Sequence, residues 1–501
     1  MANWKKLAGD TVIYGLSSIV GRFLNYLLVP LYTYKIAASS GGYGVVTHLY
    51  AYTAILLVIL TYGMETSLFY FANREKNPER VFSTILRMVG FTSLLFVALI
   101  LAFLGPISQS MGYADHPSYI WTMAIIVALD AFQAVLFSYL RFQNRPIKFA
   151  SLKLLFIGLN IGLNLLYFLL FPNLYPGNPG LWGKIYNPEV GVGYVFYINL
   201  FCTSIVTFFF LKEIGSAKSG FDKELCKRML SYTWPILLIG VFGHLNHSID
   251  KILFPKVYPG ADAQVQLGIY GAGVKIAMIM GMITQAFRYA YEPAVFGTAG
   301  KKEGAEFQAN GMKFYIIFTL LAYLAVMAYM NVLRYIINRD YWEGLRVVPI
   351  VMLSELLFGI YFNLSFWYKT DNDTHKTVWG ALFSGIGLVV LLLINFFFVP
   401  KYNYMACAWG AVAGFGVATL LSYFVGLKKS DEPIQYPMKD ISLYFFLAVV
   451  LFIGITLSNK YLGLWPALVV NTVLIFVYLA YIVKKDLPLS ELPVVGKYFK
   501  K

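Results

Sequence analysis

The sequence has few charged residues for its length and almost no cysteine. Only 13% of its 501 residues are Asp, Glu, Lys or Arg, and 59% are apolar, yet the formal net charge is +15. Soluble globular domains carry roughly 25% charged residues. A chain with half that fraction cannot cover its surface in water. The composition therefore excludes an ordinary soluble enzyme and a disordered chain, and it indicates an integral membrane protein.

The three cysteines carry no recognisable chemistry. Cys202, Cys226 and Cys407 lie far apart, without a CxxC pair or the spacing of metal ligands, so neither a disulfide framework nor a metal site is predicted. The sequence also lacks a P-loop and a GxSxG motif. We therefore expect no ATP hydrolysis by the chain itself and no cofactor.

Long apolar runs occupy almost the whole sequence. A bilayer core about 30 Å thick needs about 20 apolar helical residues, and fourteen stretches meet this requirement. One of the longest connectors, 172–190, contains four Pro and three Gly and cannot form a folded domain. We expect an all-α integral membrane protein with about fourteen transmembrane helices. The predicted spans are 11–36, 44–71, 84–107, 118–140, 149–171, 191–211, 229–254, 267–292, 314–336, 345–368, 377–399, 405–427, 441–458 and 465–483.

The basic residues of the connectors predict the orientation. One alternating set of loops, which includes both chain ends, holds 26 Lys and Arg, and the other set holds 5. By the positive-inside rule, both termini lie in the cytoplasm. Such loops contact anionic membrane lipid, so we expect membrane lipid as a partner and no nucleic acid.

The chain matches itself at a nearly constant offset. Glu65 corresponds to Glu292 at offset 227, and Arg141 corresponds to Lys369 at offset 228. Six helices separate the copies, which is the parallel-repeat arrangement of transporters with a substrate site between two halves. We therefore expect two pseudo-symmetric six-helix lobes followed by two C-terminal helices. The predicted domains are 1–215, 216–430 and 431–501, the last with a cytoplasmic tail.

Several basic residues fall inside predicted spans. A charge at the bilayer centre costs at least about 2.5–3.5 kcal/mol, so it normally faces protein or a water-filled cavity. Arg22 lies near the middle of the first span and shares a face with Asn25, while Lys275 and Arg288 lie in the eighth span. These four residues predict a cationic cavity for an anionic substrate. Pairing with carboxylates of neighbouring helices is the alternative, and Arg288 is also placed to pair with Glu292.

Five carboxylates share the membrane region. Asp130 and Glu355 lie near mid-membrane, and Glu65, Asp250 and Glu292 lie near span ends. Desolvation favours proton uptake by such groups, which makes them candidates for coupling to a proton or sodium ion. They are equally suited to act as counter-ions for the basic residues of the cavity.

The span 229–254 is unusually polar. His244 and His247 are placed to line a cavity, and Lys251 either extends to the membrane surface or pairs with Asp250. A His-x-x-His pair alone does not predict a metal site, because no further ligand is suitably spaced.

Several segments resemble bacterial polysaccharide flippases. The first is the pair Gly21-Arg22 followed by VPLYT (29–33). The others are TYGMETSLFYFA (61–72), IYGAGVKIAMIMGMITQAFRYAYEP (269–293), and the strings at 341–369 and 399–411. The resemblance covers most of residues 10–430. It indicates the superfamily of multidrug, oligosaccharidyl-lipid and polysaccharide exporters.

The resemblance implies a function. It implies two lobes around a cationic lumen, in which an undecaprenyl-pyrophosphate-linked oligosaccharide passes from the cytoplasmic to the periplasmic leaflet. Arg22 and Lys275 match basic residues of the first and eighth helices that meet the pyrophosphate in that family, and Arg288 lies in its QAFRYA string. The location implied is the bacterial inner membrane, with O-antigen and lipopolysaccharide synthesis as context and glycan polymerase or ligase machinery as partners.

Two other functions compete with this one. A MATE-like cation-coupled drug antiporter usually has twelve helices and an acidic cavity, which fits the basic membrane region poorly. A membrane glycan polymerase or ligase would need a large periplasmic loop, whereas 172–190 carries only Lys184 and Glu189 as charged residues. We therefore expect a transporter and not an enzyme.

Overall fold

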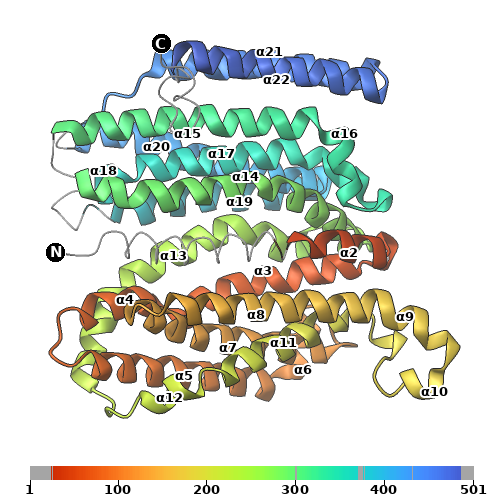
Figure 1. The fold of residues 1–501 in the computed structure, drawn as a ribbon, viewed down its shortest axis with the longest axis vertical. Coiled ribbons are helices and arrows are strands. Elements are labelled where there is room, and N and C mark those ends of the chain that lie inside the picture. The colour runs from red at the N-terminus through yellow and green to blue at the C-terminus, as the bar shows by residue number, and fades with distance from the viewer. Residues whose placement is uncertain are drawn as a thin grey trace. The chain divides into compact units, whose positions relative to one another are not determined.

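All regular structure in the described part of the chain is helical, and no strand occurs there (Figure 1). This confirms the predicted all-α class. The computed structural model describes residues 24, 26–298, 302–369, 376, 378–430 and 433–486.

By their internal contacts the residues fall into two compact units. Unit 1 takes the described residues of Met1–Gly271 and Asn395–Tyr404, and unit 2 takes those of Ala272–Ile394 and Met405–Lys501. The division into six-helix lobes at residue 215 stays a prediction.

Unit 1 contains the N-terminal helices, and α13, with 35 residues, is the longest that lies wholly within it. Its helices are α2 (Leu28–Lys35), α3 (Gly42–Thr61), α4 (Met64–Ala72), α5 (Pro78–Ala102), α6 (Leu104–Ser110), α7 (Pro117–Phe142), α8 (Pro146–Leu165), α9 (Phe171–Leu174), α10 (Pro179–Trp182), α11 (Gly193–Phe208), α12 (Leu211–Ser216) and α13 (Lys223–Val257).

Unit 2 contains the later helices, and α14, α19 and α20 contribute residues to both units. The elements are α14 (Ala263–Thr298), α15 (Lys302–Ala328), α16 (Met330–Leu333), the 3₁₀ segment η6 (Arg339–Val347), α17 (Val348–Leu364), α18 (Phe366–Lys369), α19 (Val378–Tyr402), α20 (Tyr404–Lys429), α21 (Met438–Tyr461) and α22 (Leu464–Lys485).

Within the described residues, eleven helical segments are long and apolar enough to cross a membrane, and each overlaps one predicted span. The chain is therefore a multi-pass membrane protein. Two further predicted spans, 191–211 and 229–254, coincide with helices that do not meet both criteria. The helix α11 is apolar but has only 16 residues, and α13 is long but polar. The first span, 11–36, lies largely outside the described residues. The count of fourteen spans stays a prediction.

The second predicted span, 44–71, is broken in the structure. Between α3 and α4, Tyr62 has a φ of 32° and Gly63 a φ of 74°. Glycine adopts this left-handed conformation without steric cost, whereas tyrosine does not. Average hydropathy does not detect such a break, because Tyr62 and Gly63 interrupt the helix but not the apolar run.

A close helix crossing within unit 1 explains the glycine at position 44. A side chain at Gly44 of α3 would collide with the backbone carbonyl of Gln264 in α14, and a Cβ on Gly268 would lie 2.9 Å from the Gly44 nitrogen. Small residues let two helix backbones approach this closely. The crossing therefore requires glycine at position 44.

The two C-terminal helices pack along α15 in unit 2 (Figure 1). At one end, Lys313 Nζ lies 2.7 Å from Asp486 Oδ1, and Tyr444 OH donates to Asp486 Oδ2 at 2.6 Å. Burial alone would raise the pKa of Asp486, but its bonds from Lys313 and Tyr444 outweigh burial and lower it. At the other end, Asn471 Nδ2 donates to Ala328 O at 2.8 Å. Polar contacts at both ends thus fix these helices to α15.

A buried carboxylate holds the loop helix α12 to the start of α8. Glu213 is 2% exposed and accepts hydrogen bonds from Arg145 Nη1 at 2.7 Å and from Lys148 Nζ at 2.6 Å. Burial alone would raise the pKa of Glu213, but the hydrogen bonds and positive charges of Lys148 and Arg145 together lower it. The ionised carboxylate therefore stabilises the folded state.

We predict that Glu213→Gln destabilises the protein in a pH-dependent way. Breaking a fully buried pair costs about 3–5 kcal/mol. Because Arg145 is 40% and Lys148 25% exposed, we expect a smaller loss of about 1–2 kcal/mol at pH 7. A lowered folded-state pKa gives stability that is present above the unfolded pKa of about 4.3 and is lost as the pH falls through the folded value. The difference between variant and parent should therefore shrink below pH 4.

Chemical unfolding of the purified proteins in mixed micelles, at pH 7 and about pH 3, measures this difference. Glu189→Gln is the matched control, because Glu189 is an exposed residue of another loop. Equal stability of Glu213→Gln and the parent protein at pH 7 would contradict the prediction.

Candidate functional site

Asp130 lies in a polar region inside unit 1. It is half-buried on α7, within electrostatic range of Lys153 on α8 and of Tyr50 on α3. Tyr50 OH in turn accepts a hydrogen bond from Asn199 Nδ2 at 2.6 Å. The carboxylate predicted to couple or to compensate charge thus has a cation nearby and a hydrogen-bonded tyrosine.

Glu65 lies where α4 meets α7. It accepts a hydrogen bond from Ser138 Oγ at 3.1 Å, and Arg141 and Lys153 both act on it electrostatically. The Arg141 guanidinium also lies 5.2 Å from the centre of the Phe69 ring. This carboxylate therefore has two cations of its own unit as counter-ions.

Asp250 forms a buried ion pair on α13. Lys251 Nζ lies 3.0 Å from Asp250 Oδ1, Tyr270 OH donates to Oδ2 at 2.6 Å, and Lys251 also donates to the carbonyl oxygen of His247 at 2.8 Å. The side chains of Lys251 and Asp250 are only 17% and 4% exposed. Lys251 was predicted either to extend to the membrane surface or to pair with Asp250, and in the structure it pairs with Asp250.

The two histidines of α13 differ in their surroundings. His244 is exposed, and its Nδ1 donates to the carbonyl oxygen of Gly240 at 3.0 Å, whereas His247 is half-buried. Among the residues that the structure describes, no group of three or more His, Cys, Asp or Glu side chains could hold a metal ion. That His244 and His247 line a cavity stays a prediction.

Arg288 packs on aromatic rings of unit 2. Its guanidinium on α14 lies 4.2 Å from the centre of the Phe362 ring on α17 and 5.8 Å from that of Phe358. Lys369 Nζ lies 4.9 Å from the same Phe362 ring and within electrostatic range of Arg288 and Glu292. Cation–π contact stabilises a partly desolvated charge by about 0.5–2 kcal/mol.

Glu355 lies on α17, the helix that carries Phe362, and it faces Gly281 of α14. A Cβ on Gly281 would lie 3.3 Å from Glu355 Oε2. Tyr315 on α15 shares a 2.9 Å hydrogen bond with Thr284 and donates a long one, 3.5 Å, to the Glu355 carbonyl oxygen. Glu355 and Arg288 both act electrostatically on Tyr315. Arg288, Tyr315 and Glu355 therefore form one polar region of unit 2.

Lys275 lies half-buried on α14, thirteen residues before Arg288. At 1.5 Å rise per residue, the two positions are about 20 Å apart along the helix. They cannot both contact one pyrophosphate in a single position. Arg22 and Asn25 lie outside the described residues, so the proposed partnership of the first and eighth helices stays a prediction.

Three cations of these regions were not selected from the sequence. Lys153, Arg141 and Lys369 all lie near the ends of predicted spans, where a basic residue normally extends to the membrane surface. Two of them did have a usable signal in the sequence, since Arg141 matches Lys369 at offset 228, one residue from the offset of 227 that relates Glu65 to Glu292.

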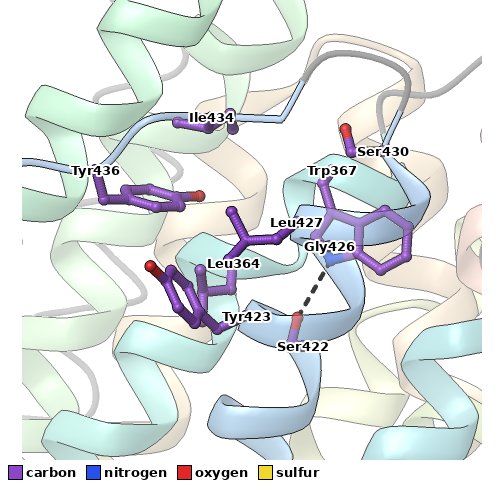
Figure 2. A pocket seen from close by; sticks show the side chains of 9 residues that line it. All are labelled: Leu364, Trp367, Ser422, Tyr423, Gly426, Leu427, Ser430, Ile434 and Tyr436. Atoms are coloured by element: carbon purple, nitrogen blue, oxygen red, sulfur yellow. Dashed lines mark hydrogen bonds between the residues drawn. The ribbon is translucent and has the colours of Figure 1, made fainter.

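A small cavity in unit 2 lies beside the ends of α17 and α20 (Figure 2). Trp367 Nε1 donates to Ser422 Oγ across it at 3.4 Å. Its volume of about 20 Å³ holds no more than about one water molecule, so it is not a substrate site. Its lining residues are Leu364, Trp367, Ser422, Tyr423, Gly426, Leu427, Ser430, Ile434 and Tyr436.

Comparison with protein families identifies the relatives of this chain. The profile of the family described as "Polysaccharide biosynthesis protein" matches residues 7–294, more than half of the sequence. The chain belongs to this family. In the search of curated protein sequences, no relative matches.

Solved structures share the fold of this family member. A structure of the lipid II flippase MurJ in an inward closed conformation has a TM-score of 0.71 at 11% identity, and the match covers 94% of this chain and 99% of that one. An inward-facing multidrug resistance MATE transporter of the MOP superfamily gives 0.61 at 14% identity, covering 84% and 96%. The MATE multidrug transporter DinF-BH gives 0.57 at 17% identity, covering 84% and 96%. At these identities the likeness shows a shared fold.

We predict that the Asp250–Lys251 pair is structural. Lys251→Met leaves a buried carboxylate without its cation and should cost about 3 kcal/mol of unfolding free energy. The double variant Asp250→Asn with Lys251→Met should recover most of this loss, because neither charge is then left unpaired. Chemical unfolding in mixed micelles measures both changes.

Glycan export in the same strains separates structure from transport. The double variant should export normally once its amount in the membrane is matched to the parent protein. Loss of export by a stably folded double variant would assign Asp250 to transport and contradict a structural role.

Proposed function

We propose that this protein is a flippase that moves an undecaprenyl-pyrophosphate-linked oligosaccharide from the cytoplasmic to the periplasmic leaflet. It works by alternating access through a central cationic cavity, and it carries out no covalent chemistry on the glycan. The substrate class, the cavity and the direction of transport are all part of the proposal.

One observation carries this proposal. A chain built almost entirely of membrane-spanning helices belongs to a polysaccharide biosynthesis family. A glycan pathway needs such a protein at the step where a hydrophilic sugar crosses hydrocarbon about 30 Å thick. The fold, which is shared with a lipid II flippase and with MATE transporters, supports transport in preference to synthesis.

The charge of the membrane region supports an anionic substrate. The predicted spans contain nine basic and five acidic residues. Because each unpaired charge there is costly, an excess of cations is expected where an anion is to be bound. A hydrated, positively charged cavity lowers the barrier for the pyrophosphate, while the polyprenyl tail stays in lipid.

The proposed binding residues are Arg22, Asn25, Lys275 and Arg288. Since Lys275 and Arg288 are about 20 Å apart along α14, we propose that they contact the substrate at successive positions. Asp130 and Glu355 are the proposed coupling groups for a proton or sodium ion, whereas Glu65, Asp250 and Glu292 act as counter-ions. His244 and His247 line the cavity.

The proposed location is the bacterial inner membrane with both termini in the cytoplasm. The 26 basic residues on the side of the chain ends support this orientation. O-antigen or a related envelope glycan is the proposed cargo, and the polymerase or ligase machinery that receives it is the proposed partner. No cofactor is needed for this cycle.

A MATE-like antiporter for cationic drugs is the second candidate. The shared fold and the mid-membrane carboxylates Asp130 and Glu355 favour it. Drug resistance of an expressing strain tests it directly. Resistance that depends on both carboxylates, without any glycan export, would favour the antiporter over the flippase.

We predict that Arg22→Ala combined with Lys275→Ala abolishes glycan export, because the pyrophosphate loses two of its proposed cationic contacts. Surface glycan of a strain lacking the chromosomal gene, complemented by each variant at matched membrane levels, measures export. A control double variant, Lys184→Ala with Lys460→Ala, removes the same charge from an exposed loop residue and from an exposed residue in the last turn of α21, neither of which is a proposed cavity residue, and it should export normally. Full export by the first double variant would overturn the cavity assignment.

A further inference from the structure

A second cationic region, which includes none of the proposed cavity residues, lies in unit 1. The end of α4 and the start of α13 border an open cleft of about 380 Å³, within the range of small-molecule sites of about 300–1,000 Å³. Both flanking loops belong to the set predicted to be cytoplasmic. The cleft is lined by Tyr70, Phe71, Arg74, Glu75, Arg228, Ser231 and Tyr232.

An aromatic stack fixes one arginine in this cleft. The Arg74 guanidinium lies 3.6 Å from the centre of the Tyr70 ring, and the Tyr232 ring stacks on Tyr70 with centroids 4.2 Å apart and 23° between the planes. Two groups so close to one ring fit only on its opposite faces. Arg74, Tyr70 and Tyr232 therefore form a three-layer stack that joins α4 to α13.

The charges in the cleft are unevenly compensated. Arg228 Nη1 forms an ion pair with Glu75 Oε1 at 2.9 Å. Arg74 makes no ion pair with any residue that the structure describes. Its side chain is exposed, as is that of Ser231 beside it. The cleft therefore has one net positive charge, and it is located on a guanidinium that is held against an aromatic ring.

This arrangement has the chemistry of a phosphate site. A guanidinium presents a rigid fork of N–H donors that matches the oxygens of a phosphate, and stacking leaves that edge available. The hydroxyls of Ser231 and Tyr232 can bond polar groups attached to the phosphate. Capping of the C-terminus of α4 by Arg74 would explain its position but not the stack or the cleft.

We propose that this cleft binds the phosphate-bearing headgroup of a membrane lipid at the cytoplasmic surface, with Arg74 as the principal contact. Two lipids share this chemistry: the polyprenyl-pyrophosphate carrier and an anionic phospholipid. Assignment to the carrier rests on the proposed function and makes the cleft a first docking point before the cavity. The phosphate chemistry of the site does not depend on that assignment.

Native mass spectrometry of the purified full-length protein tests the proposal. The probes are undecaprenyl pyrophosphate, dioleoylphosphatidylglycerol and, as a zwitterionic reference, dioleoylphosphatidylcholine. Arg74→Gln should weaken binding of at least one anionic probe about tenfold, which is the effect of about 1.4 kcal/mol. Arg74→Lys keeps the positive charge but lacks the forked N–H donors of the guanidinium. Its affinity should therefore lie between that of the parent protein and that of Arg74→Gln.

The matched control is Arg334→Gln in unit 2. Arg334 is also stacked on aromatic rings, 5.2 Å from that of Tyr335 and 4.5 Å from that of Trp342, but it lies near a loop of the predicted periplasmic set. This control should bind both anionic probes like the parent protein. Thermal unfolding of all variants shows whether a loss of binding reflects a loss of fold.

The outcomes distinguish the two lipids. Weaker binding of undecaprenyl pyrophosphate alone assigns the cleft to the carrier, and weaker binding of the phospholipid alone assigns it to a structural lipid. Weaker binding of both supports a general phosphate site. Unchanged binding of both probes by folded Arg74→Gln, or an equal loss in Arg334→Gln, overturns the proposal. Export by the Arg22 and Lys275 variant tests the proposed function separately, since neither residue lines this cleft.

Discussion

The cost of a charge in hydrocarbon is the constraint on which the rest of this structure depends. A chain that crosses a membrane many times and still holds charged residues in its helices must give each of them a partner. The described helices do so in two ways. Lys251 is neutralised by the buried carboxylate of Asp250, whereas Arg288 and Lys369 lie over the ring of Phe362. The first way cancels the charge with an anion, and the second adds the attraction of an aromatic ring.

The same constraint fits the internal repeat that the sequence predicts. In unit 1, Glu65 has the cation of Arg141 nearby, and in unit 2, Glu292 has that of Lys369. A carboxylate and a cation at the ends of two neighbouring spans can be lost only together, because either alone is costly. The two positions that the predicted repeat relates thus hold the same kind of charge pair.

Composition and hydropathy predicted the all-α membrane class and the positions of eleven spans, because length and apolar content alone determine whether a helix can cross a bilayer. They did not predict the break at Tyr62 and Gly63, which depends on backbone dihedral angles. At the candidate site, the pairing of Asp250 with Lys251 was foreseen from adjacency. The ring beneath Arg288 was not, because Phe362 lies 74 positions away and only the packing of α14 on α17 brings them together.

Aromatic support has a consequence for a protein that must release what it binds. A carboxylate competes with an incoming phosphate for the same N–H donors of an arginine, so Arg228, paired with Glu75, is a weaker anion site than its charge suggests. An aromatic ring accepts none of the N–H hydrogen bonds that a carboxylate would take, and the Arg74 guanidinium lies 3.6 Å from the centre of the Tyr70 ring. The positive charge is then held in position at a modest desolvation cost, without an opposing anion. A series of such weakly compensated cations would attract a pyrophosphate at each position without trapping it at any of them.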